Sequence, residues 1–263
     1  MSARVCKDLF AGRAGYVAKS GWGPWSASVA SVGILILSAI LGLALNEAVI
    51  ELFGFARPGD HDAPGVGSSA LNPHDLLLLL YMQVFTVVIS LVLARQFKCD
   101  PTDALALRVP VQGWGVVAPA FGMMIVAVGL YSVVGYSLWP DAVRSDLKPV
   151  VGVLRSDYGP LMVLLAIIGA PLSEEVLFRG FLLSALARSR LGFVGGALIA
   201  NIAWTALHAH YSLVGLGAVF LVGIMQCWLL WRTGSLWVPI ICHGLYNALV
   251  VGLLYLLPMD WVT

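Results

Sequence analysis

Residues 169–183 read Gly-Ala-Pro-Leu-Ser-Glu-Glu-Val-Leu-Phe-Arg-Gly-Phe-Leu-Leu. It places two adjacent carboxylates, Glu174 and Glu175, and the guanidinium of Arg179 inside an apolar run. The residues on both sides have the composition of a helix buried in a bilayer. Ionisable side chains at that depth are costly, so they usually face a bundle interior or a watery cavity and carry function. We therefore expect the rest of the chain to be arranged around this segment.

The composition indicates a membrane protein. Of the 263 residues, 60% are hydrophobic and 11% are charged, whereas soluble domains have about 25% charged residues. A spanning helix needs about 20 mainly apolar residues. Seven stretches meet or approach that length: Ser26 to Leu45, Asp75 to Ala94, Gly115 to Leu138, Gly159 to Ala187, Gly192 to Ala209, Ser212 to Trp231 and Ser235 to Leu257. The sequence therefore predicts an all-α polytopic membrane bundle of about seven transmembrane helices.

The polar residues divide the chain into three parts. Residues 1–25 form a basic segment, expected to be cytoplasmic or interfacial, which either lies on the membrane as an amphipathic segment or is a disordered tail. Residues 26–158 are expected to be scaffold helices, and residues 159–257 hold nearly all the intramembrane polar side chains and are expected to be catalytic. Ten Lys and Arg on one side of the spans against four on the other favour a cytoplasmic N-terminus.

Charge and cysteine usage restrict the partners. A net charge of +1 argues against a nucleic-acid partner, because a phosphate-binding surface needs clustered excess Lys and Arg. The four cysteines are scattered without metal-type spacing, so they are better interpreted as buried thiols than as a disulfide framework. The lipid bilayer is the partner that the composition predicts.

Helix geometry separates the two acids. Glu175 and Arg179 are four residues apart and can pair on one helix face, whereas Glu174 is rotated from Glu175 by about 100°. Pro171 has no N–H, so it is expected to kink the helix and to leave the carbonyl near Ile167 unpaired. The pair alone is equally consistent with an ion pair that only locks helix packing.

Two later spans offer partners for Glu174, the carboxylate that is not paired with Arg179. Trp204-Thr-Ala-Leu-His208 ends one of them, and His243-Gly-Leu-Tyr-Asn247 places histidine and asparagine on one face of another. Taken singly, His208 is typical of an interfacial histidine, and the pair of His243 and Asn247 is typical of hydrogen bonding between helices. At about 1.5 Å rise per residue, all of them fall within a core of about 30 Å. Convergence with Glu174 is therefore geometrically allowed.

These motifs, in this order on three late helices, resemble the CPBP family of intramembrane proteases. That family includes CAAX prenyl endopeptidases and bacterial proteins linked to bacteriocin processing and self-immunity. The similarity covers residues 161 to roughly 254, about the last hundred residues. One position departs from the family, because the second motif usually opens with phenylalanine and here has Trp204.

The resemblance implies hydrolysis of a peptide bond in a membrane-associated peptide or protein, with CAAX-type or leader-peptide processing as the expected classes. Glu174, aided by His208, would take a proton from the attacking water. His243 and Asn247 would donate hydrogen bonds to the developing oxyanion. The supporting and substrate-binding residues would be Glu175, Arg179 and Trp204.

Three alternatives remain open at this point. Glu174, His208 and His243 could hold one zinc ion with an open position for water, but the sequence lacks the His-Glu-x-x-His helix that favours zinc. A mechanism without a cofactor is therefore the preferred expectation. The chain could instead be a non-catalytic membrane protein that confers immunity or acts as a scaffold by binding a partner. A small proton-coupled transporter is the third, although no internal repeat of broken helices favours it.

Overall fold

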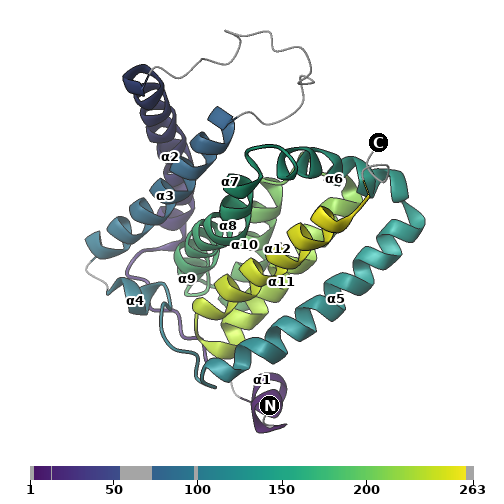
Figure 1. Cartoon of the computed structure of the whole chain (residues 1–263). Helices are drawn as coiled ribbons and strands as arrows, with labels where there is room; N and C mark the ends of the chain where they lie inside the picture. Colours follow the sequence, from purple (N-terminus) through teal and green to yellow (C-terminus); the bar gives the residue numbers. More distant parts are fainter. Residues whose placement is uncertain (1–2, 13, 54–72, 98–99, 259–263) are drawn as a thin grey trace, which may run out of the picture.

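The computed structural model describes residues 3–12, 14–53, 73–97 and 100–258, and the regular structure in those ranges is helical throughout. Figure 1 shows the arrangement of the helices. In chain order they are α1 (Ala3–Ala11), α2 (Pro24–Phe53), α3 (Pro73–Gln96), α4 (Pro101–Ala104), α5 (Val117–Leu138), α6 (Pro140–Leu154), α7 (Gly159–Leu164), α8 (Ala170–Glu174), α9 (Leu183–Leu186), α10 (Gly192–Ala206), α11 (Leu213–Thr233) and α12 (Trp237–Leu256).

The predicted membrane bundle is confirmed. In the described ranges six helices are long and apolar enough to span a bilayer, and α10 is a shorter apolar helix of 15 residues. The fourth span is a continuous helix, Gly159–Leu186, in which π-helical segments Leu165–Gly169 and Glu175–Leu182 separate α7, α8 and α9. All seven predicted stretches therefore correspond to apolar helices.

The scaffold helices enclose the later ones. In Figure 1, α2 and α3 lie together on one side, and α5 lies on the other side of the group formed by α10, α11 and α12. The contacts agree, because α2 packs mainly on α3, and α5 packs on α11 and α12. The helix that carries the two acids is thus surrounded by other helices.

The faces of α2 are arranged as a bilayer requires. Its buried positions are small or polar residues with two isoleucines, and they include Ser38 and Gly42. Thr86 on α3 donates a hydrogen bond to Ser38 over 3.2 Å. Large apolar side chains such as Val29 and Ile40 are exposed on the outside. Small residues let helix backbones approach closely, whereas the apolar outer face suits contact with lipid.

The segment before α2 is ordered and bound to the bundle. Arg232, at the end of α11, donates hydrogen bonds to the carbonyls of Asp8 and Leu9. The amide of Gly15 donates to the carbonyl of Trp231 over 3.1 Å. In the part of this segment that the structure describes, α1 and the chain after it therefore form a strap across one end of the bundle, which the disordered-tail interpretation does not fit.

Helix α6 is not among the predicted helices, because Arg144 and Lys148 give it the composition of a loop between spans. It begins at Pro140, which occupies the first helical position, where its missing N–H has no cost. Its buried residues include Val151 and Leu154, which pack against α12. Figure 1 shows α6 crossing one end of the bundle between α5 and α7.

The strap supplies a test of the fold. Trp22 is 3% exposed, stacks on Phe181 with ring centroids 4.6 Å apart, and donates its indole N–H to the Phe181 carbonyl over 3.1 Å. We expect Trp22→Ala to lower the free energy of unfolding by about 3 kcal/mol, measured by denaturant titration in detergent micelles. Trp25→Ala is the matched control because Trp25 is 85% exposed. Equal effects of the two substitutions would contradict the docking of the strap.

Candidate functional site

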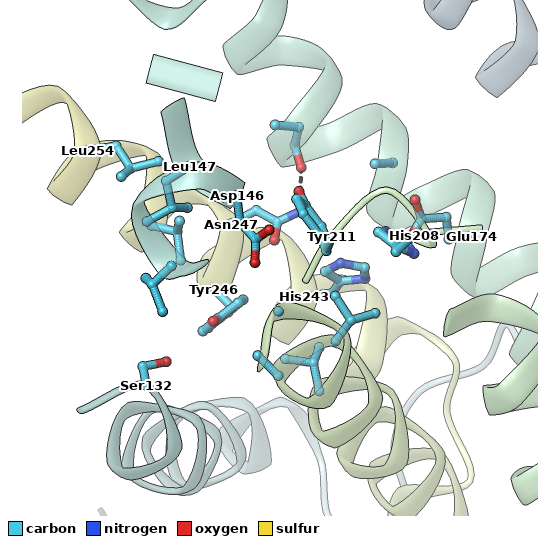
Figure 2. A pocket seen from close by; sticks show the side chains of 18 of the residues that line it. Ser132, Asp146, Leu147, Glu174, His208, Tyr211, His243, Tyr246, Asn247 and Leu254 are labelled. Carbon is cyan, nitrogen blue, oxygen red and sulfur yellow. Dashed lines mark hydrogen bonds between the residues drawn. The ribbon is translucent and has the colours of Figure 1, made fainter. Parts of the chain in front are cut away.

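A cavity of about 550 Å³ lies among the later helices. Its lining includes Glu174, His208, His243 and Asn247, together with the indole of Trp204, and the remaining walls are mainly apolar. Figure 2 shows the labelled side chains of Glu174, His208 and His243 at one end of this cavity. The structure therefore brings the four predicted catalytic residues to one cavity.

The ion pair lies behind the cavity wall. Glu175 and Arg179 are both fully buried, with Nη1 of Arg179 3.4 Å from Oε1 of Glu175, so the predicted pairing is confirmed. The Nη2 group of Arg179 donates to Oδ1 of Asn201 and to the carbonyl of Gly223, each over 3.2 Å. Its guanidinium carbon lies 4.4 Å from the ring centre of Trp204. The arginine is thus held from four sides and does not line the cavity.

Glu175 also orients a histidine. Its Oε1 lies 3.0 Å from Nδ1 of His243, which is 5% exposed. A carboxylate that pairs with a guanidinium accepts hydrogen bonds and donates none, and Oε1 of Glu175 is the atom paired with Arg179. His243 therefore carries its proton on Nδ1, and Nε2 is the ring nitrogen left for the cavity.

Trp204 connects the free acid to both histidines. Its Nε1–H donates to Oε2 of Glu174 over 2.7 Å, a short bond of the charge-assisted kind. The indole also makes edge contacts with the rings of His208 and His243, with ring centroids 5.0 and 5.8 Å apart. One indole thus contacts Glu174, both histidines and the guanidinium, and a phenylalanine here would lack the N–H.

The π-helical segment explains the position of Asn247. In a π-helix the carbonyl of Ala166 would accept from the residue five positions later, which is Pro171 and has no N–H. Nδ2 of Asn247 donates to this carbonyl over 2.7 Å instead. A Cβ on Gly244 would lie 2.7 Å from the carbonyl oxygen of Ile167. Glycine there lets α12 come close to the backbone that Pro171 disrupts.

His208 lies in the turn after α10 rather than inside that helix. Its Nδ1 is 3.2 Å from the carbonyl oxygen of Trp204. Its ring stacks on Tyr211, with centroids 6.0 Å apart and planes inclined by 22°. The half-buried imidazole is therefore positioned by both sides of the turn and faces the same cavity as Glu174.

Sequence reasoning missed four residues of this region. Asn201 and Gly223 hold the guanidinium, and Tyr211 and Asp146 line the cavity. The carboxylate of Asp146 accepts from the amide and the hydroxyl of Ser212 over 2.8 and 2.7 Å, which ties α6 to the start of α11. Burial raises the pKa of the Tyr211 phenol, and the charges of Asp146 and Glu174 add to this. An asparagine in an apolar helix was a signal for Asn201, whereas no local pattern identifies Gly223.

The zinc alternative does not fit the arrangement of the side chains. Within the described part of the chain, no three His, Cys, Asp or Glu side chains lie close enough together to hold a metal ion. Glu174, His208 and His243 share the cavity, but they do not form a ligand set as they stand. No step of the chemistry below is therefore assigned to a metal.

Comparison with known proteins agrees with the resemblance. Residues 156–249 match the family model of the type II CAAX prenyl endopeptidase Rce1-like proteins. The chain is 39% identical over 129 residues to an "Uncharacterized 24.3 kDa protein" of Escherichia coli, covering 46% of this chain and 58% of that one. It is 34% identical over 98 residues to the "Putative membrane peptidase YdiL" of Bacillus subtilis, covering 35% and 36%.

The chain thus covers less than two thirds of the length of both relatives. No solved structure matches it. The match to a membrane peptidase family and the apolar helices agree in identifying an integral, multi-pass membrane protein.

The packing around the guanidinium generates a second prediction. A Cβ on Gly223 would lie 1.7 Å from Oδ1 of Asn201 and 2.7 Å from Nη2 of Arg179. We expect Gly223→Ala to lower the free energy of unfolding by about 1–3 kcal/mol through overpacking, measured by denaturant titration. Gly122→Ala on α5 is the control, because a Cβ there meets nothing within 4 Å. An unfolding free energy unchanged in Gly223→Ala would contradict the close approach of α11 to this network.

Proposed function

Because residues 156–249 match the family model of the type II CAAX prenyl endopeptidase Rce1-like proteins, we propose that this protein is an intramembrane endopeptidase. It hydrolyses a peptide bond of a membrane-associated peptide or protein with water activated by glutamate and histidine. The observation that carries the proposal is that Glu174, His208, His243 and Asn247, on three separate parts of the chain, line one cavity. Its apolar walls suit an apolar segment of the substrate.

The reaction starts at Glu174. Its carboxylate takes a proton from a water molecule as the water oxygen attacks the scissile carbonyl carbon, and the π electrons of the carbonyl move to its oxygen. His208 faces the same space and assists this transfer. The proton then passes to the leaving amine as the C–N bond breaks. Water is added across the peptide bond, and Glu174 returns to its starting state.

The charge that develops on the carbonyl oxygen needs hydrogen-bond donors. The NH₂ group of Asn247 has two hydrogens, of which one is donated to Ala166, so the other remains for the substrate. His243 has its Nδ1 bound to Glu175, so it donates from Nε2 only as the imidazolium. In that form Nδ1 still donates to Glu175 while Nε2–H points to the substrate.

The supporting residues act through these groups. Glu175 and Arg179 are fully buried and hold His243 and the neighbouring helices. Trp204 holds the carboxylate of Glu174 in place. A general base must keep its orientation toward the water, because small displacements of reacting groups cost large factors in rate.

The third prediction tests the catalytic assignments. Glu174→Gln, His208→Ala and His243→Ala should each abolish hydrolysis while the folded protein remains in the membrane. The purified protein would be assayed against a prenylated C-terminal peptide, a leader peptide and a transmembrane peptide, with product detected by mass spectrometry. His210→Ala is the matched control, since His210 is exposed and does not line the cavity. Full activity in Glu174→Gln would contradict the proposal.

Three measurements separate the alternatives. Loss of activity with a chelator, reversed by zinc, would replace the metal-independent mechanism with a zinc-dependent one. If the chain instead binds a partner without catalysis, a Glu174→Gln, His243→Ala double variant would still restore the phenotype of cells that lack the protein. Substrate-dependent flux in liposomes would identify a transporter.

The fourth prediction concerns the indole N–H. Trp204→Phe keeps an aromatic ring over the guanidinium but removes the hydrogen bond to Glu174. A hydrogen bond to a charged group contributes about 1.5–3 kcal/mol, so we expect kcat to fall by about tenfold or more. Steady-state kinetics on a cleaved peptide measure this, with Trp25→Phe as the control. Unchanged kcat in Trp204→Phe would show that the indole N–H does not position the base.

A further inference from the structure

The proposed site has few donors for the oxyanion. The imidazole of His243 donates from Nδ1 to Glu175, so a neutral ring has only an acceptor on Nε2. Asn247 already uses one of its two amide hydrogens in a hydrogen bond to the carbonyl of Ala166. With His243 neutral, a single N–H of Asn247 is therefore left among these two residues.

Tyr211 lies at the same cavity, and its backbone and its ring both contact His208. Its backbone amide donates to the carbonyl of His208 over 3.0 Å, and its ring stacks on that of His208. The next residue, Ser212, caps α11 through the amide of Gly215 and is bound by Asp146. In the view of Figure 2, the Tyr211 side chain lies between Asn247 and His208.

The hydroxyl of Tyr211 forms no hydrogen bond with any residue in the described ranges, although the side chain lines the cavity. Tyr131, another tyrosine of the wall, instead donates its hydroxyl to the carbonyl of Val214 over 3.0 Å. A protonated phenol that faces the cavity is available to donate a hydrogen bond to a bound molecule.

We propose that the hydroxyl of Tyr211 donates a hydrogen bond to the carbonyl oxygen of the scissile peptide, which makes Tyr211 a further catalytic residue. The bond strengthens as the carbonyl becomes a tetrahedral oxyanion, and the phenol keeps its proton throughout. Tyr211 therefore supplies a donor that does not depend on the charge of His243. This inference rests on the proposed peptidase function.

The experiment compares Tyr211→Phe with the parent protein in proteoliposomes. The probe is the peptide of the panel above that the parent cleaves, made internally quenched. Phenylalanine keeps the stacking on His208 and removes only the hydroxyl, so we expect kcat to fall by about a hundredfold with KM and thermal stability unchanged. Tyr158→Phe is the matched control, because Tyr158 lies outside the cavity.

Each outcome decides the inference. A fall in kcat confined to Tyr211→Phe supports it. Parental kcat in Tyr211→Phe overturns it and leaves the peptidase function intact, as does a rise in KM with kcat unchanged. Tyr246 is another tyrosine that lines the cavity, and a larger loss of kcat in Tyr246→Phe would assign the donor to its phenol and also overturn the inference. Failure of the parent to cleave any peptide of the panel overturns the peptidase function and this inference together.

Discussion

The structure depends on the burial of one ion pair, Glu175 with Arg179. A charge removed from water costs several kcal/mol unless it is paired and hydrogen-bonded. The partners come from separate helices: Asn201 on α10, the carbonyl of Gly223 on α11 and His243 on α12. Satisfying the two charges therefore requires these helices to meet at one point. The same contacts place His243 at the edge of the cavity.

A second constraint comes from Pro171. Its missing N–H leaves the carbonyl of Ala166 in the preceding π-helical segment without a backbone donor, and in a membrane each unsatisfied backbone group is expensive. Asn247 donates to this carbonyl, and Gly244 lets α12 approach the neighbouring carbonyl of Ile167. The helix with the acids is thus tied to α12 twice, through its backbone and through Glu175. The proline in one span and the asparagine in another look independent in the sequence. In the structure they are linked, because Asn247 donates to the Ala166 carbonyl that Pro171 cannot satisfy.

Much of this could be predicted from the sequence, because the signals are local. Apolar runs of about 20 residues identify the spans, and the spacing of Glu175 and Arg179 predicts their pairing. The rest depends on tertiary approach. Gly223 is informative only because α11 lies against the guanidinium, and Tyr211 joins the site only because α10 ends early and leaves His208 in a turn. The first π-helical segment was also out of reach, since Asn247, which donates to its Ala166 carbonyl, lies on α12.

The tautomer of His243 reports on this network. In protein labelled with ¹⁵N-histidine, the signals of His243 can be assigned by their loss in His243→Gln, and their shifts give the protonation of each ring nitrogen. If the ionised carboxylate of Glu175 holds the ring, Nδ1 carries a proton at neutral pH. A ring protonated on Nε2 alone would contradict this arrangement, because Nδ1 could not then donate to Glu175.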